Sequence, residues 1–94
     1  MNLSKEKREQ LEQMGYMLIP PTLAAINLEV DQLEFLTALR TNGSDVQQAY
    51  YSGYLRQLVE TRQAIVKAAH NGSNPAQVEL LRLIGRMQNA INHA

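Results

Sequence analysis

The 94-residue sequence contains no cysteine, so it can form no disulfide bond, and nothing in it points to an oxidising compartment. A domain of this size buries only about two-thirds of the surface of its unfolded chain. Small domains without disulfides often gain the missing stability by self-association. We therefore expect one domain over residues 1–94 that forms a homo-oligomer.

An excess of charge of one sign is also missing, since nine Lys and Arg residues balance nine Asp and Glu residues. Small nucleic-acid-binding domains are usually basic, because contacts to phosphates supply most of their non-specific affinity. The balance therefore predicts that a single copy of the chain binds DNA weakly.

No hydrophobic run is long enough to cross a membrane. The first such run, MGYMLIPP, is short, contains Pro20 and Pro21, and lacks the long apolar core of a signal peptide. We expect a cytoplasmic protein that does not contact a membrane.

The residue combinations of a catalytic or metal site are missing as well. His70 and His93 are the only histidines, and a zinc site made from two distant histidines and scattered carboxylates would be unusual. No nucleophile stands beside a candidate base, and no glycine-rich loop follows a strand. We expect a protein that is not an enzyme and that binds no metal or cofactor.

What the sequence does contain is apolar residues at helical spacing, which predicts an all-α fold. In the N-terminal part, residues 1–42, Ser4 caps a first helix that Gly15 closes in a left-handed conformation. Pro21 begins a second, short helix. Asp31 and Glu34 have the spacing of a capping box, so a third helix starts there and ends at about Arg40.

Residues 45–93 predict an antiparallel helical hairpin for self-association. Asp45 caps a helix over about 46–70, and Asn71-Gly72 ends it. Asn74 then caps a helix over about 75–92, with Gln77 completing a capping box.

The last helix carries more apolar surface than one partner helix would cover. We expect the surplus to be buried between subunits. The predicted oligomer interface consists of Leu80, Leu81, Leu83, Ile84, Met87 and Ile91.

Residues 21–41 have the pattern of a helix-turn-helix. This motif needs a small residue in its first helix, apolar residues on both sides of the turn, a capping residue and an apolar anchor. The sequence supplies them in order as Ala25, Leu28, Val30, Asp31 and Phe35. Glu29 departs from the pattern, because its position tends to need positive φ and normally holds glycine; a side chain there costs roughly 1 kcal/mol.

In such a motif, side chains near the start of the second helix reach the bases of DNA. Asp31 and Glu34 would repel phosphates there, unless Glu34 accepts a hydrogen bond from a cytosine amine. The basic residues near the N-terminus form either a phosphate-contacting arm or a solvated helix face. The predicted DNA-contacting residues are Gln32, Thr37, Arg40, Thr41, Lys5, Lys7 and Arg8.

Two further features of the helices lead to expectations. Tyr50, Tyr51 and Tyr54 cluster on the long helix, and we expect at least one to pack into the core with its hydroxyl at the surface. Gly53 and Gly85 interrupt helices at a cost near 1 kcal/mol each relative to alanine. We expect them to mark close helix crossings within the hairpin or between subunits.

Residues of about 21–90 resemble, at the level of pattern, the small terminase subunits of tailed phages and related phage-type helix-turn-helix proteins. The resemblance lies in an "AY..G" opening of the long helix, an "NGS.PAQ"-like turn and a second long helix. The residues that carry it are Phe35, Ala49, Tyr50, Gly53, Leu55, Arg62, Ile65, Ala69, Asn71, Gly72, Ser73, Ala76, Gln77 and Leu81.

The resemblance implies a ring of subunits built on the helical hairpin. It further implies that the helix-turn-helix units recognise double-stranded DNA and present it to a large, ATP-hydrolysing subunit. The chain departs from the family in its acidic turn and its lack of basic excess. The alternatives are an assembly adaptor that does not bind DNA and a small dimeric transcriptional regulator.

Overall fold

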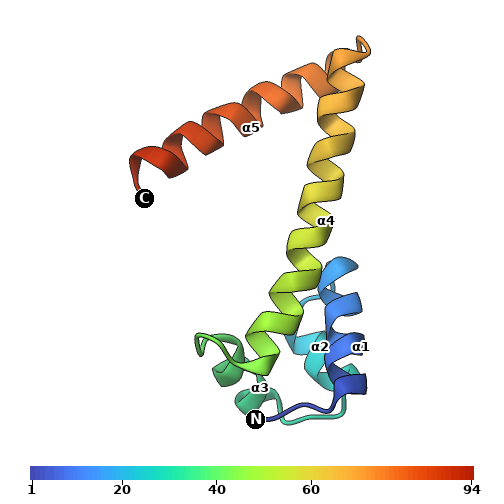
Figure 1. Cartoon of the computed structure of the whole chain (residues 1–94), viewed down its shortest axis with the longest axis vertical. Helices are drawn as coiled ribbons and strands as arrows, with labels where there is room; N and C mark the ends of the chain where they lie inside the picture. Colours follow the sequence, from blue (N-terminus) through green and yellow to red (C-terminus); the bar gives the residue numbers. More distant parts are fainter. The chain divides into compact units, whose positions relative to one another are not determined.

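The computed structural model describes all 94 residues and consists of five α-helices without a strand (Figure 1), which confirms the predicted all-α fold. The helices are α1 (Lys5–Tyr16), α2 (Pro21–Asn27), α3 (Gln32–Leu39), α4 (Asp45–His70) and α5 (Asn74–Asn92). The chain divides into two compact units, Met1–Leu58 and Val59–Ala94. The division falls inside α4 and not in the loop before it.

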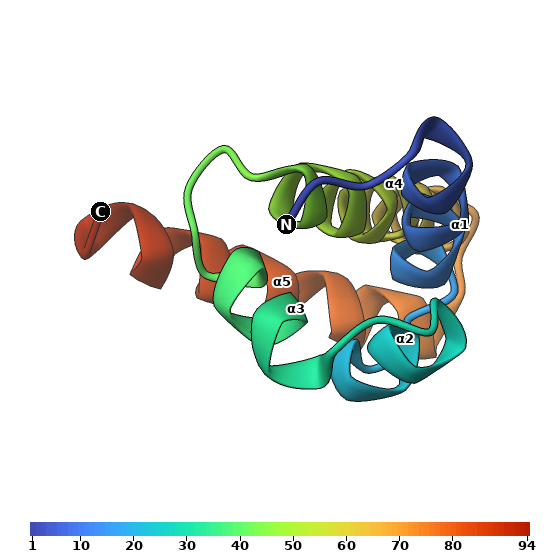
Figure 2. The ribbon, with the colours of Figure 1, turned by 90° about the horizontal axis from the view of Figure 1, so that it is seen from below.

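The first unit has a core to which all four of its helical segments contribute. Leu11 of α1, Ala25 of α2, Phe35 of α3 and Val46 of α4 are completely buried. Figure 2 shows α1, α2, α3 and the start of α4 around a common centre. The first turns of α4 therefore belong to the N-terminal core, because their apolar side chains complete it.

Local signals in the sequence set the starts of the first three helices. The Ser4 hydroxyl accepts a hydrogen bond from the Lys7 amide at 3.2 Å, and the Asp31 carboxylate accepts one from the Glu34 amide at 2.8 Å. Pro21 occupies the first turn of α2, where its missing amide costs nothing. These predicted helix starts are confirmed.

The predicted end of α1 is wrong. The helix continues through Gly15 to Tyr16, and the residue with positive φ is Leu18, at 62°. Gly15 has a different role, since a Cβ atom on it would lie 2.1 Å from the carbonyl oxygen of Tyr50. Similarly, a Cβ atom on Gly53 would lie 1.8 Å from the carbonyl oxygen of Glu12. The backbones of α1 and α4 thus touch where they cross.

This crossing corrects the expectation for Gly53, whose close neighbour is α1 and not a helix of the hairpin. Gly85 has no other atom within 4 Å of where its Cβ would be, so it marks no crossing within the chain. An approach between subunits at Gly85 stays a prediction.

The caps of the two long helices lie one residue before the predicted positions. Ser44 caps α4 by accepting from the Gln47 amide at 3.0 Å, and Ser73 caps α5 by accepting from the Ala76 amide at 3.3 Å. Asp45 and Asn74 are the first helical residues instead.

In the second unit, α4 and α5 are joined by a turn at Gly72, whose φ of 95° matches the predicted left-handed position. Next to this turn the Gln77 side-chain amide donates to the Ala69 carbonyl at 3.1 Å, which replaces its predicted capping-box role. Ala69 is the one buried hydrophobic residue of the unit. Beyond the turn, α5 diverges from α4 (Figure 1).

Candidate assembly and nucleic-acid interfaces

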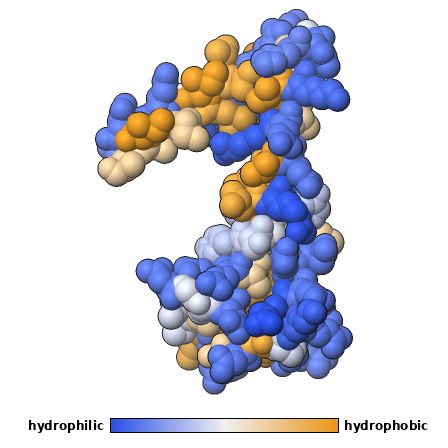
Figure 3. Space-filling model, in the orientation of Figure 1, coloured by the Kyte–Doolittle hydropathy of each residue, from blue (hydrophilic) through white to orange (hydrophobic).

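Helix α5 has no buried residue, although its apolar residues recur at helical spacing. Figure 3 shows hydrophobic side chains gathered along α5 and the adjoining end of α4. Of the predicted interface residues, Leu80 and Leu83 are half-buried and the other four are exposed. We use the name α5 stripe for Val78, Leu81, Ile84, Met87 and Ile91, which are between 45% and 69% exposed.

The α5 stripe is a substantial source of binding energy. Burying the exposed half of such a side chain is worth about 1 kcal/mol, so the five contribute roughly 5 kcal/mol per copy before the costs of association. Water-exposed leucines scattered singly are common on protein surfaces, but a continuous stripe along one helix is not. The arrangement therefore fits a helix whose partner is another molecule.

The last turns of α4 border a second exposed surface, an open depression of about 630 Å³ that includes Val59, Arg62, Val66, Lys67 and His70. Two valines lie along it, and a guanidinium and an ammonium group lie beside them. It combines apolar contact area with positive charge.

Positive charge is in excess in the second unit and not in the first. Met1–Leu58 contains five Lys and Arg residues and seven Asp and Glu residues, whereas Val59–Ala94 contains four and two. The basic residues of the second unit are Arg62, Lys67, Arg82 and Arg86. Attraction to phosphate is therefore expected to depend on these residues more than on the N-terminal helices.

The segment predicted as a helix-turn-helix consists of α2, a turn over residues 28–31, and α3. Three of the apolar positions of the pattern are buried, since Ala25 and Phe35 are fully buried and Leu28 is 2% exposed, whereas Val30 is only partly buried against the core. Glu29 has a φ of 58°, the positive value that the pattern predicts for its position. These features fix how α3 lies on α2 and leave the other side of α3 in solvent.

Four of the seven predicted DNA-contacting residues lie on α3 or directly after it, and all four are exposed: Gln32, Thr37, Arg40 and Thr41. The Thr41 hydroxyl donates to the Thr37 carbonyl at 2.9 Å, so it is already engaged within the helix end.

Leu33 has the same three-residue spacing as Leu36 and Leu39, but it does not belong to the core. Its side chain is 74% exposed. The reason is its angular position: α3 turns its core side toward Phe35, and a residue two positions earlier lies about 200° around an α-helix. Because Phe35 is the apolar anchor of the pattern and marks the buried side of α3, its position could have identified Leu33 as a residue on the outer side.

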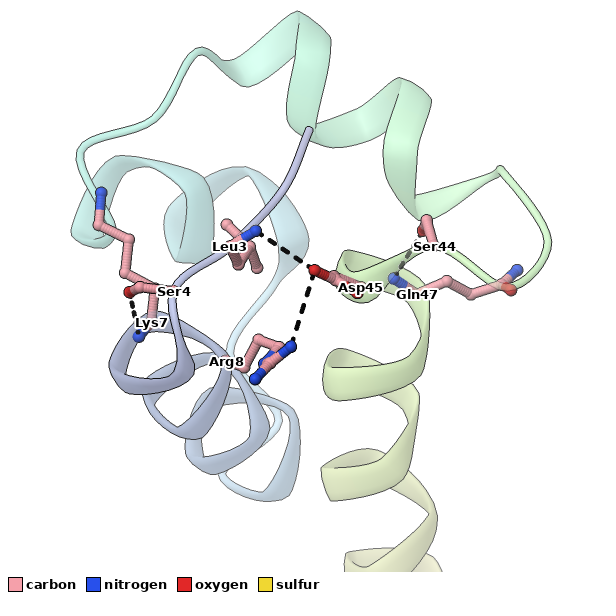
Figure 4. Close-up of polar contacts among 7 residues, drawn as sticks. All are labelled: Leu3, Ser4, Lys7, Arg8, Ser44, Asp45 and Gln47. Carbon is pink, nitrogen blue, oxygen red and sulfur yellow. Dashed lines mark hydrogen bonds and ion pairs between the residues drawn. The ribbon is translucent and has the colours of Figure 1, made fainter.

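The predicted basic arm is not a uniformly positive surface. Arg8 places its guanidinium 3.9 Å from the Asp45 carboxylate, which also accepts a hydrogen bond from the Leu3 amide at 3.4 Å (Figure 4). A neighbouring depression is lined by Lys5 and Arg8 but also by Glu9, Glu12 and Asp45. Carboxylates therefore offset the positive charge of Lys5 and Arg8.

Tyr50 confirms the expectation that one tyrosine of the cluster packs into the core, as it is 7% exposed. Its hydroxyl does not point to solvent as predicted, since it donates to the Ile19 carbonyl at 2.6 Å. Burial raises the pKa of this hydroxyl above its ordinary value, and the nearby Tyr51 and Tyr54 raise it further. Tyr51 is edge-on to both other rings, with centroid distances of 5.6 and 6.3 Å.

Nowhere in the chain do three or more His, Cys, Asp or Glu residues form a group that could hold a metal ion. None of the helices has the length and hydrophobicity needed to cross a membrane. Comparison with models of known protein families, with curated proteins and with solved structures found no match.

Proposed function

We propose that the protein is a homo-oligomeric, DNA-binding accessory protein of phage or prophage type that positions duplex DNA for packaging. The observation that carries the proposal is the α5 stripe, which leaves a whole amphipathic helix without a buried residue. Further copies of the chain would cover this stripe. The assembly would hold several α2–turn–α3 segments against one DNA duplex.

Assembly would also compensate for the low charge of each copy. When several weak sites are linked, each later contact becomes intramolecular, and overall affinity rises without any new contact. The buried inner positions and exposed outer side of α3 support this mode of DNA contact. The resemblance to small terminase subunits adds a large ATPase subunit as the protein that would receive the DNA.

The second candidate is an assembly adaptor that does not bind DNA. It is favoured by the acidic excess of Met1–Leu58, because two surplus carboxylates in the unit that contains α3 would oppose approach to phosphates. In this case α2 and α3 would serve only as a packing module.

Light scattering on the purified protein tests the assembly. We expect a mass of several copies, and a dimer would instead favour a small dimeric regulator. Substituting both Leu81→Glu and Ile84→Glu should dissociate the assembly, because it places charges within the α5 stripe. Asn89→Glu is the matched control, since Asn89 is an exposed polar residue about 140° around α5 from Ile84, and the mass of this variant should equal that of the wild type. A double variant with the wild-type mass, or a monomeric wild type, would contradict the proposal.

Fluorescence anisotropy with duplex DNA tests the DNA-binding part of the proposal. Binding that falls steeply as salt rises is expected, since it indicates phosphate contacts. Absence of binding at low salt would support the adaptor.

A further inference from the structure

Leu33 is the most exposed large hydrophobic residue of the chain, at 74%. It lies in the first turn of α3, and the fold gives it no packing role. Together with Thr37, Ala38 and Met1 it lines an open depression of about 540 Å³ on the outer side of α3. Covering Leu33 would remove this apolar surface from water, which would favour binding of a ligand with a matching apolar group.

The polar neighbours of Leu33 restrict what that contact can be. Gln32 and Thr37 are neutral, and Glu34 is the charged side chain that lines the depression. Guanine is usually recognised by Arg or Lys, which this part of α3 lacks. The amide of Gln32 and the apolar side chain of Leu33 instead match an adenine–thymine pair, which offers a hydrogen-bonding adenine edge and the thymine methyl group.

A protein partner fits this surface less well. Protein-docking surfaces are usually contiguous apolar patches of several hundred Å². Leu33 is instead a single protruding leucine whose neighbours in the sequence, Gln32 and Glu34, are polar, and only Met1 and Ala38 add apolar surface to the depression. This combination of one leucine with polar side chains is complementary to the floor of the major groove, where the thymine methyl is an apolar group among polar base edges.

We infer that Leu33 determines sequence specificity by contacting a thymine C5-methyl group in the major groove, with Gln32 on adenine. This inference rests on the proposed function, because it requires α3 to lie in the groove. It explains how a unit with an acidic excess can distinguish DNA sequences, because the two side chains that read the bases are uncharged.

The test begins with duplexes selected by the wild-type protein from a random DNA pool. The selected duplex is then synthesised with deoxyuridine in place of thymidine, which removes the methyl group and keeps the hydrogen-bonding edge. Wild-type Kd should rise about fourfold for each contacted methyl, the equivalent of roughly 0.8 kcal/mol per buried carbon.

Leu33→Ala should bind the two duplexes equally well, because its shortened side chain no longer reaches the methyl group. Leu23→Ala is the matched control: Leu23 is 53% exposed on α2, and its loss should preserve the difference between the duplexes. Circular dichroism checks that both variants fold.

The outcomes separate the inference from the proposed function. If wild-type protein binds DNA with equal affinity for both duplexes, or if Leu33→Ala retains the difference, the inference is overturned and DNA binding stands. If the wild type binds no duplex, the proposed function fails and the inference with it. If Leu33→Ala alters the mass of the assembly and leaves DNA binding unchanged, Leu33 belongs to a protein interface and the inference is wrong.

Discussion

Replacing Gly53 with alanine tests whether α1 and α4 touch through their backbones. The new Cβ would lie 1.8 Å from the Glu12 carbonyl oxygen and 2.9 Å from the Tyr16 amide nitrogen. Both atoms belong to the backbone of α1, so no side-chain rotation can relieve the clash. Reaching ordinary contact distance requires α1 to move by roughly 1.5 Å.

That movement would disturb the polar contacts beside the crossing. Arg56 lies 2.7 Å from the Glu12 carboxylate and stacks over the Tyr16 ring, and the Gln57 amide donates to the Tyr16 carbonyl at 2.9 Å. Overpacking in a core costs about 1–3 kcal/mol, and the helix preference of alanine over glycine returns about 1 kcal/mol. Because the clashing atoms belong to the backbone, the overpacking cost lies at the upper end of this range, about 3 kcal/mol, and we expect a net loss of about 2 kcal/mol.

Thermal and urea unfolding followed by far-ultraviolet circular dichroism measure this loss. For a domain of this size, about 2 kcal/mol lowers Tm by roughly 8–16 °C. Ser52→Ala is the control, since Ser52 is the exposed neighbour of Gly53 on the same helix. The free energy of unfolding of this variant should differ from that of the wild type by less than about 0.5 kcal/mol. A Gly53→Ala protein as stable as the wild type would refute the backbone contact.

Three other substitutions have expected outcomes that urea unfolding can measure. Glu29→Gly should raise stability by up to about 1 kcal/mol, because the φ of 58° strains a residue with a Cβ; a loss would mean that the Glu29 side chain stabilises the turn. Asp31→Ala should cost about 1 kcal/mol by removing the cap of α3, whereas an unchanged midpoint would show that the 2.8 Å bond contributes nothing. Tyr50→Phe should cost about 1 kcal/mol through the lost bond to Ile19. The raised pKa of Tyr50 further predicts that wild-type stability falls as pH rises above about 10, because the unfolded chain loses this proton first; the fall should be smaller in Tyr50→Phe, and equal slopes would contradict it.

Much of the helical framework follows from local chemistry. The starts of α1, α2 and α3 follow from Ser4, Pro21 and Asp31, and the positive φ of Glu29 follows from its place in the turn of the helix-turn-helix pattern. These features depend on residues within one or two turns of each other, which is the range that sequence patterns describe.

The features that sequence patterns did not predict depend on partners far along the chain. Gly15 is a residue type that often ends a helix. Its role here is instead to allow close contact with the backbone of Tyr50, 35 positions later. Asp45 could have capped α4, yet its carboxylate is engaged by Leu3 and Arg8, and Ser44 caps instead. Both depend on a helix crossing that spacing alone does not specify.

The candidate site shows the same division. The α5 stripe is visible in the sequence because it needs only the helical period, and four of its predicted interface residues are exposed. The offset of positive charge in the N-terminal arm was not predicted, since Asp45 approaches Arg8 only through the fold. The exposure of Leu33 does not follow from its spacing, because a three-residue period cannot tell which of two leucine-containing sides meets the core.

The boundary between the two units inside α4 has a consequence for spectroscopy. All four tyrosines and the single phenylalanine precede Val59, and the chain has no tryptophan. Intrinsic fluorescence therefore reports only on Met1–Leu58, while peptide absorption reports on every helix. Melting curves from the two signals will coincide if the whole chain unfolds in one cooperative step and separate if the C-terminal helices melt on their own.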